Sequence, residues 1–106
     1  MHAMKLTAPG GLDQLHLAEI ESRAPGFGEI QVEIRATSLN FHDYAVVTGL
    51  IPADDGRIPM SDGAGVVTAV GEGVTTFAEG DRVLSYFFPN WAGGRPTLPD
   101  LLGVPG

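Results

Sequence analysis

The sequence contains no cysteine among its 106 residues. A disulfide framework, a thiol nucleophile and a thiolate metal site are therefore excluded. Basic residues are scarce as well: there are six, with Lys5 the only lysine, against 13 acidic residues, which gives a net charge of −7. Because affinity for nucleic acid comes mainly from clustered Lys and Arg side chains, no nucleic-acid partner is expected.

Long apolar runs are also missing, and no stretch approaches the ~20 residues that a membrane-spanning helix requires. The first residues, Met1-His2-Ala3-Met4, lack the basic and apolar regions of a secretory signal. We therefore expect no membrane partner and a cytoplasmic location. Hydrophobic residues make up 43% of the chain, a composition typical of a globular domain, and the length suffices for one domain and not for two.

The stretch from Ser61 to Val83 is the most informative part of the chain. Residues 63–70 are small or β-branched, which predicts a buried strand. The glycines at 71 and 73 predict a tight reversal with positive φ, and residues 78–81 predict a second turn before a strand resumes at Arg82. Together these signals predict an antiparallel meander.

Three strands and a helix are predicted upstream of this meander. Residues 4–8 and 15–20 have short strand patterns, and residues 30–36 alternate apolar with polar side chains, which predicts one dry and one wet face. Residues 40–47 are predicted to be a short helix that Asn40 opens, and Gly49 is placed to end it.

The last part of the chain has a different composition. Proline and glycine account for eight of the last eighteen residues, which interrupts regular structure too often for a long element. We therefore assign residues 1–88 to the folded domain and residues 89–106 to a loop or linker.

Two motifs together resemble a known family. Asp62 to Val83 has the spacing Gly-Ala-Gly-Val-Val…Val-Gly-Glu-Gly-Val…Gly-Asp-Arg-Val, and Asn40-Phe41-His42-Asp43 lies upstream. This pattern resembles the N-terminal catalytic domain of the medium-chain dehydrogenase/reductase superfamily, and most closely its zinc-free branch of quinone reductases, zeta-crystallin-like proteins and enoyl reductases. The resemblance spans Met4 to Leu84. Met60 departs from the pattern, which usually has glycine there.

The resemblance implies a mainly β fold, a GroES-like, partly open β-barrel with one short helix. It also implies that the Rossmann domain and the closing strands of the barrel lie outside these residues. Strand edges would then be exposed, and unpaired edges recruit other strands, so self-association into a homo-oligomer is expected.

The resemblance further implies the substrate side of a zinc-independent, NADPH-dependent reductase. In such an enzyme a small-molecule substrate, a quinone or an α,β-unsaturated carbonyl, receives a hydride from a cofactor held mainly by the missing Rossmann domain. These 106 residues alone are expected to be inactive. Two alternatives remain open: a non-catalytic GroES-like binding or assembly module, and an enoyl reductase fragment of a multidomain synthase.

Three candidate site residues lie at the start of the predicted helix, where Asn40, Asp43 and Tyr44 have i, i+3 and i+4 spacing. The resemblance implies that Asn40 and Asp43 bind the nicotinamide end of the cofactor, and it makes Tyr44 a candidate catalytic proton donor. Helix capping explains Asn40 and Asp43 as well. Packing of an amphipathic ring on the barrel is the alternative role of Tyr44.

No metal is expected. In zinc-dependent relatives the catalytic metal is held by a Cys at the position that matches Asn40 and by a His at the position that matches Ser61, and both ligands are absent. The structural four-cysteine lobe is absent too. An improvised site around His42 and an oxygen site at Asp54-Asp55 are less favoured. Ser61, His42 and Asp62 do not form a hydrolytic triad, because no Gly-x-Ser-x-Gly motif is present.

Overall fold

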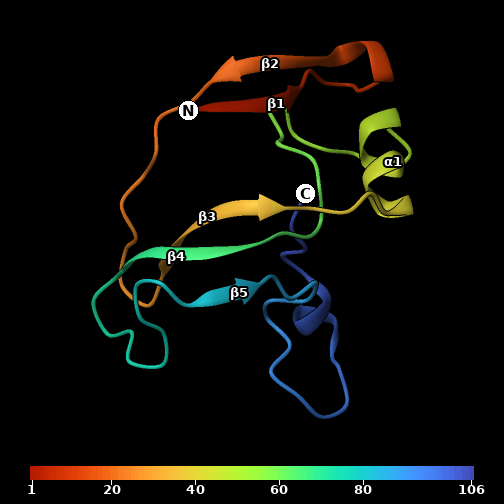
Figure 1. The fold of residues 1–106 in the computed structure, drawn as a ribbon. Helices are drawn as coiled ribbons and strands as arrows, with labels where there is room; N and C mark the ends of the chain where they lie inside the picture. Colours follow the sequence, from red (N-terminus) through yellow and green to blue (C-terminus); the bar gives the residue numbers. More distant parts are fainter. The chain divides into compact units, whose positions relative to one another are not determined.

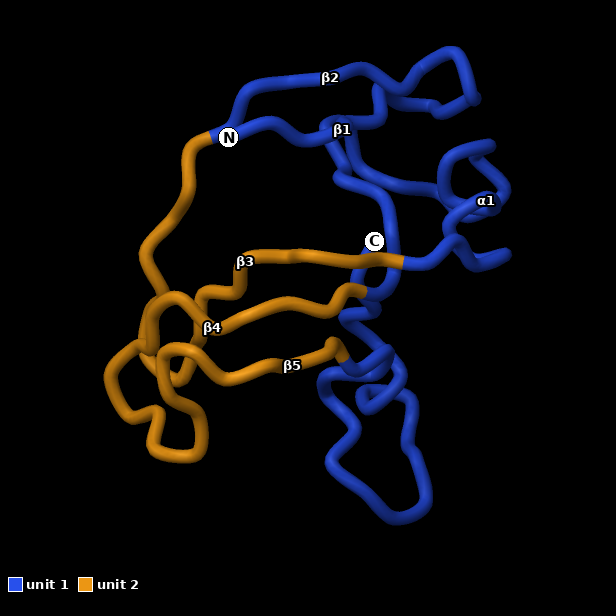
Figure 2. Tube along the Cα trace, viewed as in Figure 1, with its two compact units in different colours: residues 1–20, 38–62, 86–106 blue, residues 21–37, 63–85 orange.

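The computed structural model describes residues 1–106 and contains five strands, one α-helix and two short 3-10 helices (Figure 1). The chain divides into two compact units, each built from segments that are distant in sequence (Figure 2). Unit 1 contains residues 1–20, 38–62 and 86–106, and unit 2 contains residues 21–37 and 63–85. The expected mainly β class is confirmed, and the strands form two separate sheets rather than a closed barrel.

Unit 2 is a three-stranded antiparallel sheet. Its strands are β3 (Ile30–Ala36), β4 (Ala64–Val70) and β5 (Arg82–Leu84), with β4 in the middle. The predicted antiparallel meander is confirmed. The pairing of β3 with β4 shifts register twice, between Gln31 and Val32 and between Ile34 and Ala36. Such shifts mark β-bulges, which bend and twist a strand.

The reversal after β4 depends on two glycines for different reasons. Gly73 has φ +85°, as expected for a turn that requires the left-handed region. Gly71 does not have positive φ: a Cβ atom there would overlap the carbonyl oxygen of Gly26. The prediction of positive φ is therefore correct for Gly73 and wrong for Gly71, where close backbone approach is the constraint.

The dry face predicted for β3 is only partly present. Its first three residues are half-buried, whereas residues 33–36 are exposed, and Ile34 is 59% exposed. The alternating pattern identifies side chains that share a face. It does not establish that another layer covers that face, and unit 2 by itself is a single sheet.

Unit 1 begins with an antiparallel hairpin of β1 (His2–Leu6) and β2 (Leu15–Glu19), joined through the 3-10 helix η1 (Leu12–Gln14). The first strand starts and ends two residues earlier than predicted. Beyond β1 the backbone N–H of Ala8 donates to Asp55 Oδ1 at 2.9 Å, instead of to a strand. One of the two loop carboxylates considered for an oxygen site therefore has a structural partner.

The helix α1 (Phe41–Thr48) has the caps predicted for it. Asn40 is the N-cap residue, and Gly49 ends the helix with φ +87°. The helix contributes Val46 and Val47 to a small apolar core; the other members of this core are Leu6, Leu15 and Ala53. Burial of these side chains fixes one face of α1, while Phe41 at the start of the helix is exposed.

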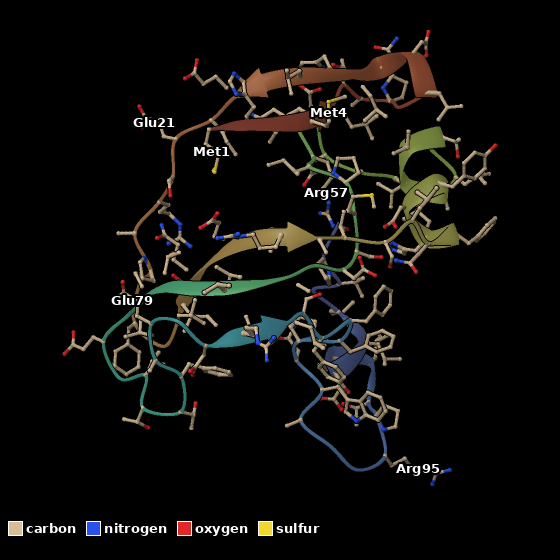
Figure 3. The ribbon with its side chains drawn as sticks, in the orientation of Figure 1. Met1, Met4, Glu21, Arg57, Glu79 and Arg95 are labelled. Carbon is tan, nitrogen blue, oxygen red and sulfur yellow. The ribbon has the colours of Figure 1, made fainter.

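The C-terminal part of unit 1, expected to be loop or linker, is irregular apart from the 3-10 helix η2 (Leu98–Leu101). Arg57, labelled in Figure 3, donates from Nη2 to the carbonyl oxygen of Val104 at 3.2 Å. Arg95 extends from the outer end of a loop in the same figure. No helix of the structure has both the length and the apolar character needed to cross a membrane.

Candidate functional site

The first turn of α1 is organised around the buried carboxylate of Asp43, which is 1% exposed. Its Oδ2 accepts the backbone N–H of Asn40 at 2.8 Å, as in a capping box. Its Oδ1 accepts the backbone N–H of Ser61 at 2.7 Å. Both oxygens are thus bonded to the main chain, and the second bond ties the helix start to a loop 18 residues away in the sequence.

Asn40 lies beside this carboxylate but has an exposed side chain. Its Nδ2 donates to Asp62 Oδ2 at 3.1 Å, to the carbonyl oxygen of Ser38 at 3.3 Å and to Ser61 Oγ at 3.4 Å. Asp62 also accepts the backbone N–H of Ser38 at 2.8 Å and a hydrogen bond from the Ser38 hydroxyl. The sequence carries no signal for the participation of Ser38.

The pKa of Asp43 results from two opposing effects. Burial disfavours the charged carboxylate and raises the pKa. Hydrogen bonds from Asn40 and Ser61 stabilise the same charge and outweigh burial, so the pKa of Asp43 lies below its ordinary value. The carboxylate is therefore a permanent anion at neutral pH and not a general acid.

This shift predicts loss of stability in acid. Because the pKa of Asp43 is lower in the folded than in the unfolded chain, the unfolded chain binds the proton more readily. The stabilisation is complete above the unfolded pKa of about 4 and is lost as the pH falls through the folded pKa. The NMR chemical shift of the Asp43 side-chain carboxyl carbon, followed as a function of pH, should give a titration midpoint below that of an ordinary aspartate. A midpoint at or above the ordinary value would contradict the prediction.

His42 and Tyr44 are placed differently from Asn40 and Asp43. The Nδ1 atom of His42 is buried without a hydrogen-bond partner, 3.8 Å from Asp43 Oδ1, and its ring meets Phe87 edge-on with centroids 5.3 Å apart. Tyr44 is 48% exposed, with its ring centroid 6.3 Å from that of Phe41. The structure therefore brings Asn40 and Asp43 together and leaves Tyr44 at the surface.

The donor set around Asn40 does not suit zinc. Asn40 Nδ2 and Ser61 Oγ are 3.4 Å apart, so the positions matched to two zinc ligands do meet, but they supply an amide and a hydroxyl. Zinc sites in proteins are built from imidazole, thiolate and carboxylate ligands. No group of three or more His, Cys, Asp or Glu side chains is placed to hold a metal ion.

The loop that carries Ser61 contains the only non-glycine residue with positive φ, Met60, at φ +90°. This conformation is strained for a residue with a Cβ and costs of order 1–3 kcal/mol. We expect the Met60→Gly variant to exceed the Met60→Val variant in free energy of unfolding by about 2 kcal/mol, with the natural protein between them. Urea denaturation followed by circular dichroism measures the order of the three proteins. The reverse order would contradict the conformational explanation.

Comparisons with known proteins agree with this fold. A sequence profile described as the alcohol dehydrogenase GroES-like domain matches residues 26–106. A mycocerosic acid synthase-like polyketide synthase of Mycolicibacterium smegmatis is 49% identical over 77 residues, which are 71% of this chain and 4% of the synthase.

Two solved structures are similar over most of the chain. The quinone oxidoreductase of Escherichia coli complexed with NADPH has a TM-score of 0.74 and 33% identity, over 79% of this chain and 26% of that one. A cobalt- and zinc-bound thermostable alcohol dehydrogenase of Pyrobaculum aerophilum has a TM-score of 0.76 and 39% identity, over 81% of this chain and 26% of that one. The chain therefore spans only a small part of each of these proteins.

Proposed function

Because the chain belongs to the alcohol dehydrogenase GroES-like domain family of the medium-chain dehydrogenase/reductase superfamily, we propose that it is the substrate-side domain of a zinc-independent, NADPH-dependent oxidoreductase. The substrate is a quinone or an α,β-unsaturated carbonyl compound. Residues 1–88 form the domain proper, and residues 89–106 link it onward. The proposed partners are the small-molecule substrate, a Rossmann domain and, through exposed strand edges, further copies of the chain, in the cytoplasm.

The observation that carries this proposal is the polar cluster at the start of α1. Asp43 is 1% exposed with both oxygens bonded to backbone N–H groups, and it belongs to no group of three or more potential metal ligands. The two positions that match zinc ligands hold Asn40 and Ser61, whose amide and hydroxyl are poor zinc ligands. This chemistry supports hydride transfer without zinc, as in the zinc-free branch.

NADPH supplies the hydride, and this chain supplies the groups around it. Asn40 offers an exposed carboxamide to the nicotinamide end, and Asp43 holds the backbone of Asn40 in place through its 2.8 Å hydrogen bond. A proton must reach the substrate when the hydride does. Tyr44, with a half-exposed ring one helical turn from Asn40, is the proposed donor.

A second candidate function has its own support. The polyketide synthase segment of Mycolicibacterium smegmatis is 49% identical to this chain, a higher value than for the quinone oxidoreductase. The same site would then serve an enoyl reductase within a multidomain synthase, with an acyl substrate attached to a carrier. The reading frame that flanks these residues decides between a free reductase and a synthase, because carrier or ketoreductase sequence occurs only beside the latter.

The test of the proposed function is the Asn40→Leu variant in the protein that carries this domain together with its nucleotide-binding domain. We expect kcat/KM with NADPH to fall by about tenfold or more, because one polar contact is worth about 1.4 kcal/mol or more at such a site. Stopped-flow absorbance of NADPH measures the effect. The Asn90→Leu variant is the control, since Asn90 donates only to the carbonyl oxygen of Leu102 in the C-terminal segment.

The same protein also tests zinc independence. Extensive dialysis against a chelator should leave kcat unchanged, and the purified protein should contain no stoichiometric zinc. Loss of activity on chelation, restored by zinc, would overturn this part of the proposal. Equal activity of the Asn40→Leu and unsubstituted proteins would overturn the assignment of Asn40.

A further inference from the structure

The side chain of Asn40 is held by a carboxylate that has no role in the helix cap. Asp62 lies 22 residues away in the sequence, and its Oδ2 accepts a hydrogen bond from Asn40 Nδ2 at 3.1 Å. We propose that Asp62 is a positioning residue, which fixes the orientation of the Asn40 carboxamide so that Asn40 meets a ligand as a hydrogen-bond acceptor. This inference rests on the proposed function for the identity of the ligand, but not for the orientation itself.

Electrostatics allows only one orientation of this carboxamide. Rotating it by half a turn would exchange its nitrogen and oxygen and place the oxygen about where Nδ2 now lies, facing Asp62 Oδ2, Ser61 Oγ and the Ser38 carbonyl oxygen. A carboxylate and a carbonyl group have no proton to donate to another oxygen. The nitrogen-inward orientation gains a charge-assisted hydrogen bond, which is about twice as strong as a neutral one.

Asp62 is itself fixed, so it can impose this orientation. The backbone N–H of Ser38 donates to Asp62 Oδ1 at 2.8 Å, and the Ser38 hydroxyl bonds to Oδ2. Ser38 lies two residues before Asn40, so the carboxylate clamps both ends of the short segment that leads into the helix. A carboxylate held at three points by this segment cannot turn away from Asn40 without losing the other bonds.

The consequence concerns the chemistry offered to a ligand. The two Nδ2 protons of Asn40 are directed at Asp62, Ser61 and Ser38. Oδ1 faces the Asp43 backbone N–H in the capping box, and because a carbonyl oxygen has two lone pairs it keeps capacity for one further donor. A ligand that binds Asn40 must therefore present an N–H or O–H donor. The carboxamide N–H of a nicotinamide and a ribose hydroxyl both meet this requirement.

The side-chain amide spectrum of the 106-residue chain tests this inference without any cofactor. The sequence has only two asparagines and two glutamines, Asn40, Asn90, Gln14 and Gln31, so four pairs of NH2 signals are expected. In the natural chain the Asn40 pair should be shifted from free-amide positions and exchange slowly with water. The Asp62→Asn variant should exchange at this pair about tenfold faster, as expected for loss of one charge-assisted hydrogen bond.

Two further variants separate positioning from general destabilisation. Asp62→Glu keeps the carboxylate and should restore the Asn40 signals at least in part. Asp81→Asn makes the same chemical change at an aspartate that accepts the Ala78 backbone N–H, and it should leave them unchanged. The Asn90 pair, bonded to the Leu102 carbonyl, reports in each spectrum whether the chain is folded.

The outcomes distinguish this inference from the proposed function. Free-amide shifts for Asn40 in the natural chain overturn the inference without any variant, and so does an Asp62→Asn spectrum with an unchanged Asn40 pair. Failure of the full protein to bind NADPH, together with the expected spectra, overturns the proposed function alone. If NADPH binds, a hydrogen bond from the nicotinamide carboxamide to Asn40 Oδ1 predicts that a cofactor analogue with a methyl group in place of the carboxamide NH2 binds more weakly to the natural protein than NADPH does. If the analogue also binds more weakly than NADPH to the Asn40→Leu variant, the nicotinamide carboxamide is not the group that donates to Asn40. A ribose hydroxyl is then the remaining candidate donor.

Discussion

Replacement of Asp43 with alanine is expected to lower the free energy of unfolding by about 3 kcal/mol or more. The carboxylate is 1% exposed and accepts two backbone N–H groups, from Asn40 and from Ser61. Alanine leaves both donors buried or half-buried without a partner, and each such group costs about 1–3 kcal/mol. Loss of the helix cap adds to the effect. Urea denaturation followed by far-ultraviolet circular dichroism measures the change.

Asp81→Ala is the matched control for this experiment. Asp81 also accepts a backbone N–H, that of Ala78 at 2.9 Å, but it is exposed, so water replaces the lost partner. We expect a loss of at most about 1 kcal/mol there. Asp43→Asn keeps the shape of the side chain but turns an NH2 group toward one of the two N–H donors, so it should be nearly as damaging as alanine. Equal stability of the Asp43→Ala and Asp81→Ala variants would show that the buried Asp43 carboxylate contributes no more to stability than an exposed one.

The size of this effect bears on the function of Asp43. A residue that both caps α1 and holds the Ser61 loop determines where the exposed Asn40 carboxamide lies. Asp43 is 1% exposed and each of its oxygens accepts a backbone N–H, so a ligand has little access to its carboxylate. We therefore propose that Asp43 contributes to the site through the position of Asn40, in place of the direct cofactor contact that the resemblance implies for it, and that Asn40 makes the contact.

Apart from the mainly β class, which the family resemblance implied, the features predicted correctly from the sequence are local ones. The caps Asn40 and Gly49, the strand bounds 30–36 and the strand start at Arg82 agree with the structure because each depends on residues within one turn or strand. The hydrogen bond between Asp43 and Ser61 could not be predicted from spacing, because it depends on the path of the loop between them.

Two other differences have the same origin. The register shifts of β3 and its open face depend on neighbouring strands and layers, which a period-two pattern does not specify. The positive φ of Met60 could not be predicted from the residue type, because methionine rarely adopts that conformation. The glycine that the family pattern usually has at this position would have indicated it. The resemblance identified the candidate residues, and the tertiary contacts show which of them lie together.

The centre of the unit 2 sheet should tolerate substitution as little as the helix cap does. Gly65 is buried in β4, the middle strand, where it pairs with Ile34 on one side and Val83 on the other. Its φ is not positive, so the glycine is required by space and not by conformation. A Cβ atom would overlap the carbonyl oxygen of Glu33 and lie 2.8 Å from the carbonyl carbon of that residue.

Gly65→Ala is therefore expected to destabilise the chain by about 3 kcal/mol or more, because the obstacle is the backbone of the paired strand and cannot rotate away. Gly63→Ala is the matched control: the added methyl group would meet only the side chain of Ile34, at 3.1 Å, and that side chain is exposed enough to move. A domain of this size has roughly 5–15 kcal/mol of stability, so Gly65→Ala should shift the urea midpoint strongly and Gly63→Ala should shift it little. Similar midpoints for the two variants would mean that β3 and β4 can move apart locally to admit the methyl group. The steric requirement for glycine at position 65 would then be contradicted.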